Sequence, residues 1–309
     1  MNVNLVSDRP ASISLLRISA MILLGYFMMG SVVSLMVIAI LYDGNLVDAM
    51  ANPLGHPEMR NILVLAQGLA SFVGLVLIPW YYLRFLEQRH LTDLFKAIPS
   101  WEIIFAVFLI TIAFGVAISP VTEWNASVQF PSWTGAMGEM FTNMEKQAEL
   151  LIKLITSNLS PSIFALVFVV VAIIPALGEE FVFRGLIQTE LQRAFGNPHA
   201  AIWVAAAIFS AFHFQFFGFF PRLLIGALLG YLYYWSGNLW LPILAHFFNN
   251  GIQMIALYMF QQGLHSMDVE STESAPLYLV TLGAVIALAL LYQIRNTLNP
   301  QVISHRDSA

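Results

Sequence analysis

Long apolar runs recur along this chain and restrict its fold more than any other feature. A helix needs about 20 mainly apolar residues to cross the hydrocarbon core of a bilayer. Runs of about that length occur at residues 18–41, 62–83, 101–119, 161–181, 200–217, 221–236, 239–260 and 276–293. Only 10% of the residues are charged, whereas about 25% are charged in soluble domains. The sequence therefore predicts an all-α, polytopic membrane protein with about eight transmembrane helices.

The positions of Lys and Arg predict how these helices are oriented, because basic residues concentrate in cytoplasmic loops. With the N-terminus inside, the inner segments hold Arg9, Arg17, Arg84, Arg89, Lys96, Arg184, Arg193, Arg295 and Arg306. The outer segments hold only Arg60, Lys146, Lys153 and Arg222. We therefore expect a multi-pass protein of the inner (cytoplasmic) membrane of the cell, with both termini in the cytoplasm.

Net charge and cysteine content exclude several classes of function. The formal net charge is −5 and the sequence has no cluster of Lys and Arg, so we expect no nucleic-acid partner. The sequence also has no cysteine, which excludes disulfides, thiol nucleophiles and cysteine-ligated metal sites. The bilayer itself is the expected partner.

The segment between the third and fourth runs has a helical period of its own. Apolar side chains fall on one face, at Met137, Met140, Phe141, Met144, Ala148, Leu151 and Ile155, with charged side chains elsewhere. An amphipathic helix over 135–158 that lies on the outer membrane surface is one interpretation; a lid or substrate gate is the other. The expected organisation is residues 1–120 as N-terminal transmembrane helices, 121–159 as this helix and its loop, 160–255 as a catalytic core, and 256–309 as the last helix with a cytoplasmic tail.

The first polar motif, Gly178-Glu179-Glu180-Phe-Val-Phe-Arg184, ends one of the most apolar runs. Ionisable groups at membrane depth cost several kcal/mol and are most often functional. Glu180 and Arg184 are four residues apart and can form an ion pair on one helix face. Glu179 lies about 100° round the helix and has no such partner, which makes it a candidate general base. The alternative is that all three side chains are solvated at the membrane edge.

A second motif, Phe209-Ser-Ala-Phe-His213, is expected at the same depth as Glu179. The hairpin between the two helices turns near Gly196-Asn197-Pro198, a combination typical of turns. Glu179 lies 17 residues before Gly196 and His213 lies 17 residues after it, so each is about 25 Å from the turn at ~1.5 Å per residue. We therefore expect Glu179 and His213 to face each other, although a buried histidine can also be purely structural.

A third motif, His246-Phe-Phe-Asn249-Asn250, lies near the start of the seventh run. His246 and Asn250 are one helical turn apart, so both can donate a hydrogen bond to the same oxygen atom. Asn249 is also within reach, and spacing alone does not separate the two asparagines. The structural alternative is that these polar side chains link helices, where each hydrogen bond contributes only ~0.6–2 kcal/mol.

These groups are suited to peptide-bond hydrolysis by an activated water. Glu179 and His213 can orient and deprotonate the water, while His246 and Asn250 can stabilise the tetrahedral oxygen. No serine has the context of a nucleophile, because G-x-S-x-G is absent. A competing arrangement is a zinc site with Glu179, His213 and His246 as ligands and an open position for water. H-E-x-x-H is absent, so the sequence leaves this alternative open.

With these three motifs in this order, residues 160–255 resemble the CAAX protease and bacteriocin-processing (CPBP, or Abi) family of intramembrane proteases. Its motifs E-E-x-x-x-R, F-x-x-x-H and H-x-x-x-N are all present on successive predicted helices, the fourth, fifth and seventh. The resemblance implies an endopeptidase that cleaves a membrane-associated protein or peptide. It implies Glu179 and His213 as water-activating residues, His246 with Asn250 rather than Asn249 at the oxyanion, and Glu180, Arg184 and Phe209 in support.

The resemblance leaves the catalytic type and the substrate open. Members of this family have been described both as metalloproteases and as glutamate proteases without a catalytic metal. We favour the second mechanism, which requires no cofactor, and keep zinc as the alternative. Prokaryotic relatives act in peptide maturation or bacteriocin immunity, so a prenylated CAAX substrate is not implied.

Two rival functions use the same residues differently. A transporter would bind an ion or substrate through Glu179, but the inverted repeat common in transporters is not visible here. A non-catalytic immunity or scaffold protein would use the motifs only for helix packing.

Overall fold

The computed structural model describes residues 9–51, 56–157, 159–264 and 271–298, and these ranges are helical with short connections and no strand. The first helical pair comprises α1 (Ala11–Met21), η2 (Ile22–Met29), α2 (Gly30–Leu41) and α3 (Leu46–Ala51), followed by α4 (Pro57–Phe72), η4 (Val73–Leu77), α5 (Ile78–Tyr81) and η5 (Tyr82–Leu86). The next elements are η6 (Leu91–Leu94), α6 (Trp101–Ala117), α7 (Ser119–Ser127), η7 (Ser132–Thr134) and α8 (Gly135–Thr156).

The second half of the chain contains the motif-bearing helices. A continuous helix is built from α9 (Pro161–Phe168), η8 (Val169–Ile173), α10 (Ile174–Glu180), η9 (Phe181–Gln188) and α11 (Thr189–Phe195). It is followed by α12 (Pro198–Ala211), η10 (Phe216–Gly218), α13 (Phe219–Ser236), α14 (Trp240–Gln261) and α15 (Leu277–Leu298). Gly196, with a φ of +64°, ends this helix in the left-handed conformation. The predicted hairpin turn is therefore confirmed.

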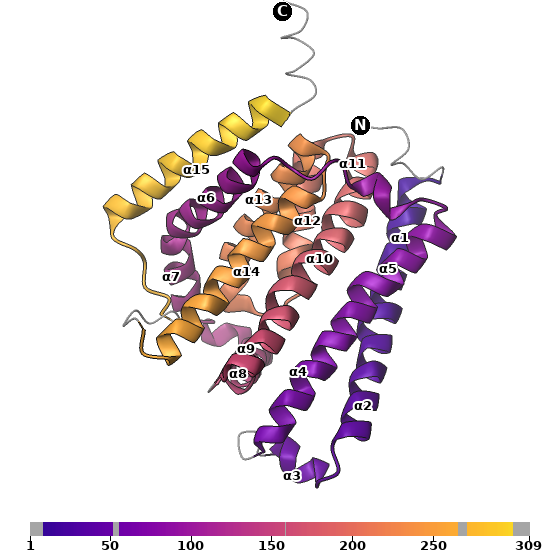
Figure 1. Cartoon of the computed structure of the whole chain (residues 1–309), viewed down its shortest axis with the longest axis vertical. Coiled ribbons are helices and arrows are strands. Elements are labelled where there is room, and N and C mark those ends of the chain that lie inside the picture. The colour runs from indigo at the N-terminus through magenta and orange to yellow at the C-terminus, as the bar shows by residue number, and fades with distance from the viewer. Residues whose placement is uncertain (1–8, 52–55, 158, 265–270, 299–309) are drawn as a thin grey trace, which may run out of the picture.

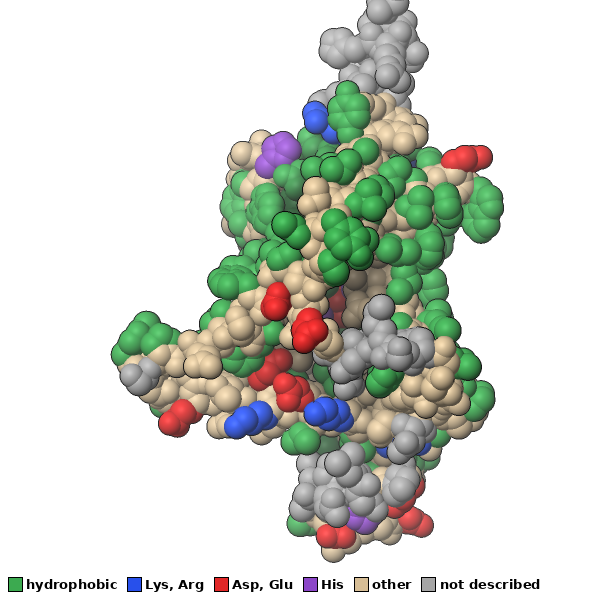
Figure 2. Space-filling view, turned by 90° about the vertical axis from the view of Figure 1, so that its left-hand side faces the viewer, with side chains coloured by type: hydrophobic (Ala, Val, Ile, Leu, Met, Phe, Trp, Pro, Cys, Tyr) green, Lys and Arg blue, Asp and Glu red, His purple; other side chains and the backbone are tan. Residues whose placement is uncertain are grey.

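The helices form one bundle in which α1 begins and α15 ends at the same end, here called the α1 end (Figure 1). The opposite end, here called the α8 end, holds α8, which is seen almost end-on. The pair formed by residues 11–41 and 57–86 lies on one flank of the bundle, and α15 packs along α6 on the other. On the face seen in Figure 2, hydrophobic side chains cover much of the upper part, whereas most of the acidic and basic side chains gather across the lower part.

An all-α polytopic membrane fold is confirmed by the lengths and composition of these helices. Five described helices are long and apolar enough to span a membrane: Ala11–Leu41, Glu58–Leu86, Pro161–Phe195, Phe216–Ser236 and Leu277–Leu298. The pair α6 and α7 passes as a sixth if its 43° bend is taken as a single broken span. The predicted total of eight spans stays a prediction.

The apolar run at 161–181 lies within a longer helix that reaches Phe195, as the predicted turn at Gly196 requires. One predicted helix boundary was wrong. The run expected at 200–217 ends as a helix at Ala211, and Phe214 has a φ of +55°. No Gly or Pro marks this break in the apolar sequence, so the composition did not indicate it.

Gly178 allows α10 to approach η4 closely just before the first motif glutamate. A Cβ atom at this position would lie 2.6 Å from Leu75 Cβ and 3.3 Å from its carbonyl carbon. Because Leu75 is buried, its backbone has little room to move away. The glycine therefore fixes the distance between the two helices at the depth of Glu179.

We expect Gly178→Ala to lower the free energy of unfolding by about 1–3 kcal/mol, the usual cost of overpacking a filled interior. Thermal unfolding of the purified protein in detergent measures the change. The matched control is Gly115→Ala on α6, where an added Cβ meets no atom within 4 Å. Equal melting temperatures for both variants would contradict the assigned role of Gly178.

Candidate active site

Glu180 is the buried centre of the polar cluster. Its side chain is fully buried, and Oε1 accepts hydrogen bonds from Arg184 Nη1 at 2.8 Å and from His246 Nδ1 at 2.7 Å. The predicted ion pair with Arg184 is therefore present. The contact with His246 was not predicted, because it joins α10 to α14 across 66 residues of sequence.

Arg184 extends this cluster to α13 and α12. Its Nη2 donates a hydrogen bond to the carbonyl oxygen of Gly226 at 2.9 Å. Its guanidinium carbon lies 4.6 Å from the ring centroid of Phe209, within the range of a cation–π interaction. Arg184 is thus buried inside the bundle and is not part of a loop, so it carries no information on orientation. Without it, the predicted inner segments still hold eight Lys and Arg residues and the outer ones four.

Glu179 lies beside the cluster with one carboxylate oxygen unbonded. Glu179 Oε2 is buried and has no hydrogen-bond partner. It lies 3.9 Å from His213 Nε2 and 4.0 Å from His246 Nε2. The expectation that Glu179 and His213 meet at one depth is confirmed by this distance.

His213 is held by its own main chain and not by a continuing helix. Its Nδ1 lies 2.9 Å from the carbonyl oxygen of Phe209, one turn earlier. Since a carbonyl only accepts, Nδ1 carries the proton, and Nε2 of the neutral ring has a free lone pair. The second motif was expected to lie wholly on a helix; instead His213 follows the end of α12. This break exposes 28% of the His213 side chain.

His246 is oriented in the same manner from α14. The Glu180 carboxylate accepts from its Nδ1, so this atom also carries a proton and Nε2 points toward Glu179. Phe209 packs edge-on against both imidazoles, with centroid distances of 5.0 Å to His213 and 6.0 Å to His246. The buried Phe209 ring therefore supports three groups at once, which is the supporting position expected for it.

Asn250 links α14 to the helix that carries the first motif. Its Nδ2 donates to the Val171 carbonyl at 3.0 Å, and its Oδ1 accepts from Asn249 Nδ2 at 3.0 Å. Pro175, four residues after Val171, has no N–H to offer this carbonyl. Asn250 uses one of its two N–H groups there, which leaves the second for a ligand.

The distances of Glu179 Oε2 from His213 Nε2 and from His246 Nε2 are longer than those between the ligands of a zinc ion. Ligands of a tetrahedral zinc ion at ~2.1 Å from the metal are about 3.4 Å apart, closer than the 3.9 Å and 4.0 Å observed. Within the described ranges, no three His, Cys, Asp or Glu side chains lie close enough to hold a metal ion. A water, which needs about 2.8 Å to each partner, can bridge acceptors at this spacing.

Arg222 is a neighbour of the site that the sequence motifs do not include. It lies near the start of α13, donates from Nη2 to Gln215 Oε1 at 3.1 Å, and is close enough to Glu179 and His213 to interact with them electrostatically. The sequence predicts only an outer segment for it. Its position inside an apolar run was the signal that could have identified it.

Comparison with known proteins finds a family that this part of the chain resembles. Residues 161–252 match the model of the Rce1-like family, described as type II CAAX prenyl endopeptidase Rce1-like. The resemblance expected for residues 160–255 is confirmed over this segment. This segment, here called the Rce1-like region, contains all three motifs from Glu179 to Asn250.

One curated relative matches part of the chain and adds no function. The chain is 35% identical over 104 residues to the uncharacterized protein YpbD of Bacillus subtilis (strain 168). The match covers 32% of this chain and 50% of that protein, so the chain spans about half the length of this relative. No solved structure matches the chain. The helices before Pro161 and after residue 252 lie outside the family match.

Proposed function

We propose that the protein is an intramembrane endopeptidase that hydrolyses a peptide bond in a membrane-associated protein or peptide. The observation that carries this proposal is the unbonded Glu179 Oε2, which faces the Nε2 atoms of two histidines whose Nδ1 atoms are already engaged. Glu179 Oε2 and His213 Nε2 are two acceptors beside one small space, and a water molecule can donate one hydrogen bond to each. The Rce1-like region supports a peptidase of this kind.

In the proposed reaction, Glu179 and His213 orient the water and take its proton as its oxygen attacks the carbonyl carbon of the substrate. The carbonyl π electrons move to the oxygen, which becomes an oxyanion. As an imidazolium, His246 carries an Nε2–H that can donate to this oxygen, together with the second N–H of Asn250. The oxyanion electrons then re-form the C=O bond as the C–N bond breaks, and the proton taken from the water passes to the leaving amine.

Glu180 and Arg184 position His246 in this mechanism and do not contact the substrate. Glu180 accepts from the His246 Nδ1–H and so stabilises the imidazolium form that the oxyanion step needs. Arg184 balances the charge of Glu180, while Glu179 balances that of His246. This buried group of four charges is then neutral, which lowers the cost of placing it in a membrane.

A zinc-dependent route through Glu179, His213 and His246 is the second candidate, because an unbonded carboxylate oxygen between two imidazoles also suits a cation. Zinc would supply a Lewis acid and an activated water. The three side chains would have to move closer together to hold it. Non-catalytic immunity or scaffolding, and transport, predict no hydrolysis at all.

Hydrolysis by the purified protein tests the proposal and separates these candidates. We expect cleavage of a pool of membrane-anchored peptides in detergent micelles, with initial rates changed less than about twofold by a chelator, since glutamate can serve as the general base alone. Metal analysis of the same sample shows whether a tightly held ion remains. Loss of cleavage with chelator and recovery with added zinc would favour the metal route. No cleavage of any peptide would contradict a peptidase.

A further inference from the structure

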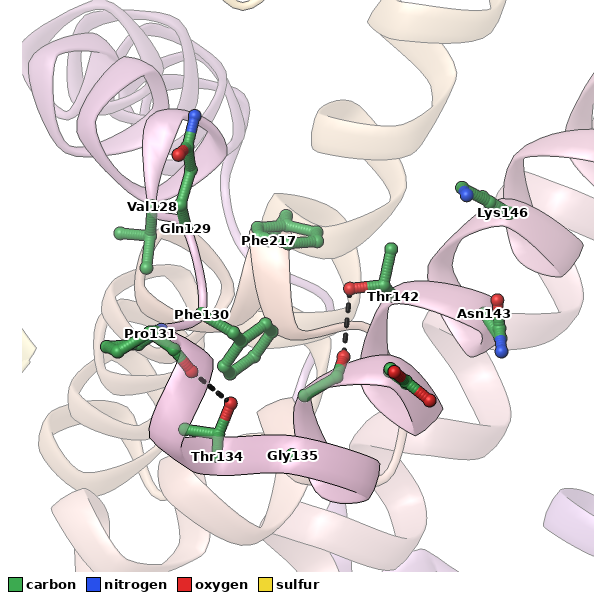
Figure 3. Close-up of a pocket in the computed structure, with 12 residues that line it drawn as sticks. Val128, Gln129, Phe130, Pro131, Thr134, Gly135, Thr142, Asn143, Lys146 and Phe217 are labelled. Atoms are coloured by element: carbon green, nitrogen blue, oxygen red, sulfur yellow. Dashed lines mark hydrogen bonds between the residues drawn. The ribbon is translucent and has the colours of Figure 1, made fainter.

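A second candidate binding site lies beside the connection that carries His213. A pocket of about 690 Å³ opens between the segment 128–135 and α8, and Phe217 forms part of its wall (Figure 3). None of the motif residues lines it. Phe217 follows His213 by four residues, so one short connection borders both the candidate active site and this pocket.

One residue in the pocket wall, Gln129, has unpaired main-chain groups. Val128 leaves α7 in an extended conformation, with φ −61° and ψ 131°. For the next residue, Gln129, neither the main-chain N–H nor the C=O has a hydrogen-bond partner in the part of the chain that the structure describes. Free N–H and C=O groups on an extended segment are what a peptide strand needs in order to pair with a protein.

The remaining walls have the mixed character of a peptide site. Phe130 and Phe217 contribute aromatic surface, with ring centroids 5.8 Å apart. Thr142 projects from α8 into the space near Phe217 (Figure 3), and its hydroxyl donates to the Gly138 carbonyl at 2.9 Å. The charged wall residues are one acid, Glu139, and one base, Lys146. This balance does not favour an anionic lipid headgroup.

The pocket walls contact the connection of residues 213–217 directly. Glu145 Oε2 of α8 accepts from the Phe217 main-chain N–H at 3.4 Å. The ring of Phe130 lies 4.6 Å from that of Phe216. Because an extended chain advances at most ~3.6 Å per residue, the four residues from His213 to Phe217 span no more than about 14 Å. A substrate needs only about four to six residues to run from a bond at His213 into the pocket.

We propose that this pocket is an exosite that binds an extended peptide segment flanking the cleaved bond, chiefly through main-chain hydrogen bonds to Gln129. The inference rests on the proposed peptidase function for the identity of that peptide. Binding through main-chain groups tolerates different side chains, so one site of this kind serves substrates of varied sequence.

Peptide binding to full-length Glu179→Gln protein in detergent micelles tests the exosite without requiring catalysis. The probe is a pool of fluorescent octapeptides of randomised Ala, Ser, Thr and Val, measured by fluorescence anisotropy. A matched pool carries N-methyl groups at alternate peptide nitrogens, which remove the donors needed for strand pairing. We expect saturable binding of the first pool and at least tenfold weaker binding of the second.

Variants locate the binding to the pocket. Thr142→Trp, made in the Glu179→Gln protein, fills the space beside Phe217 and is expected to weaken binding at least tenfold with an unchanged melting temperature. Lys153→Trp is the matched control, because Lys153 is exposed on the same helix but does not line the pocket, and its binding should stay within twofold. No binding of the first pool, equal binding of the two pools, or equal binding by Thr142→Trp would overturn the exosite.

The same variants in active protein separate failure of the exosite from failure of the proposed function. Cleavage with a KM unaffected by Thr142→Trp would overturn the exosite and leave the peptidase intact. Pocket-dependent binding in a protein that cleaves no peptide would contradict the peptidase and reassign the pocket to a peptide-binding role.

Discussion

Glu179→Gln is expected to abolish peptide cleavage while the protein stays folded. An amide has nearly the shape of a carboxylate but cannot take a proton from water, and loss of a general base costs about 10²- to 10⁴-fold in rate. Folding should be preserved because Glu179 Oε2 makes no hydrogen bond that the change would break. Initial rates of peptide cleavage measure the effect, and thermal unfolding in detergent verifies the fold.

The matched control for this change is Glu149→Gln on α8. Glu149 is exposed and belongs to none of the motifs, so its variant should cleave within twofold of the parent. A Glu179→Gln protein that retains cleavage within tenfold of the parent would contradict the role of Glu179 as the base. It would also favour a mechanism in which His213 alone activates the water.

Arg184→Met is expected to destabilise the fold by about 3–5 kcal/mol, the usual result of leaving a buried charge without its partner. Glu180 is fully buried, and Arg184 forms an ion pair with it. Arg184 also donates a hydrogen bond to the Gly226 carbonyl oxygen. The variant also loses the contact of the guanidinium with the Phe209 ring. Denaturant unfolding of the purified protein in mixed micelles measures the loss.

A double variant separates the charge effect from the loss of packing. Glu180→Gln combined with Arg184→Met removes both charges and should recover part of the stability lost in the single variant. Arg84→Met is the control, because Arg84 is exposed and surface changes usually stay within about 0.5 kcal/mol. If Arg184→Met alone has the same free energy of unfolding as the parent, the Glu180–Arg184 pair does not have the stabilising role assigned to it.

The sequence predicted the fold class well because membrane helices follow from local composition. Each of the expected apolar runs falls on a described helix, although the count of spans remains open by length and composition. The helix boundary near His213 could not be predicted. His213 bonds back to the Phe209 carbonyl and Phe214 adopts a positive φ, and neither event has a sequence signal in a run of aromatic residues.

Depth within the bundle was predictable from counting residues along two helices. The equal distances of Glu179 and His213 from the turn at Gly196 placed them level, and their side chains lie 3.9 Å apart. The same counting was not available for His246, whose Nε2 nevertheless lies 4.0 Å from Glu179 Oε2. The start of α14 is joined to η6 by Leu239, whose N–H donates to the Leu94 carbonyl at 3.0 Å.

The sequence by itself determined which chemical groups the site contains, their order along the chain and the pairing of Glu180 with Arg184. These follow from hydropathy and from helical spacing, which are local properties. Only the tertiary structure decided that Glu180 also holds His246 and that Asn250 bonds Val171. It also decided that both imidazoles turn Nε2 toward Glu179. Such contacts depend on how distant helices approach one another, and no spacing within a single helix encodes that distance.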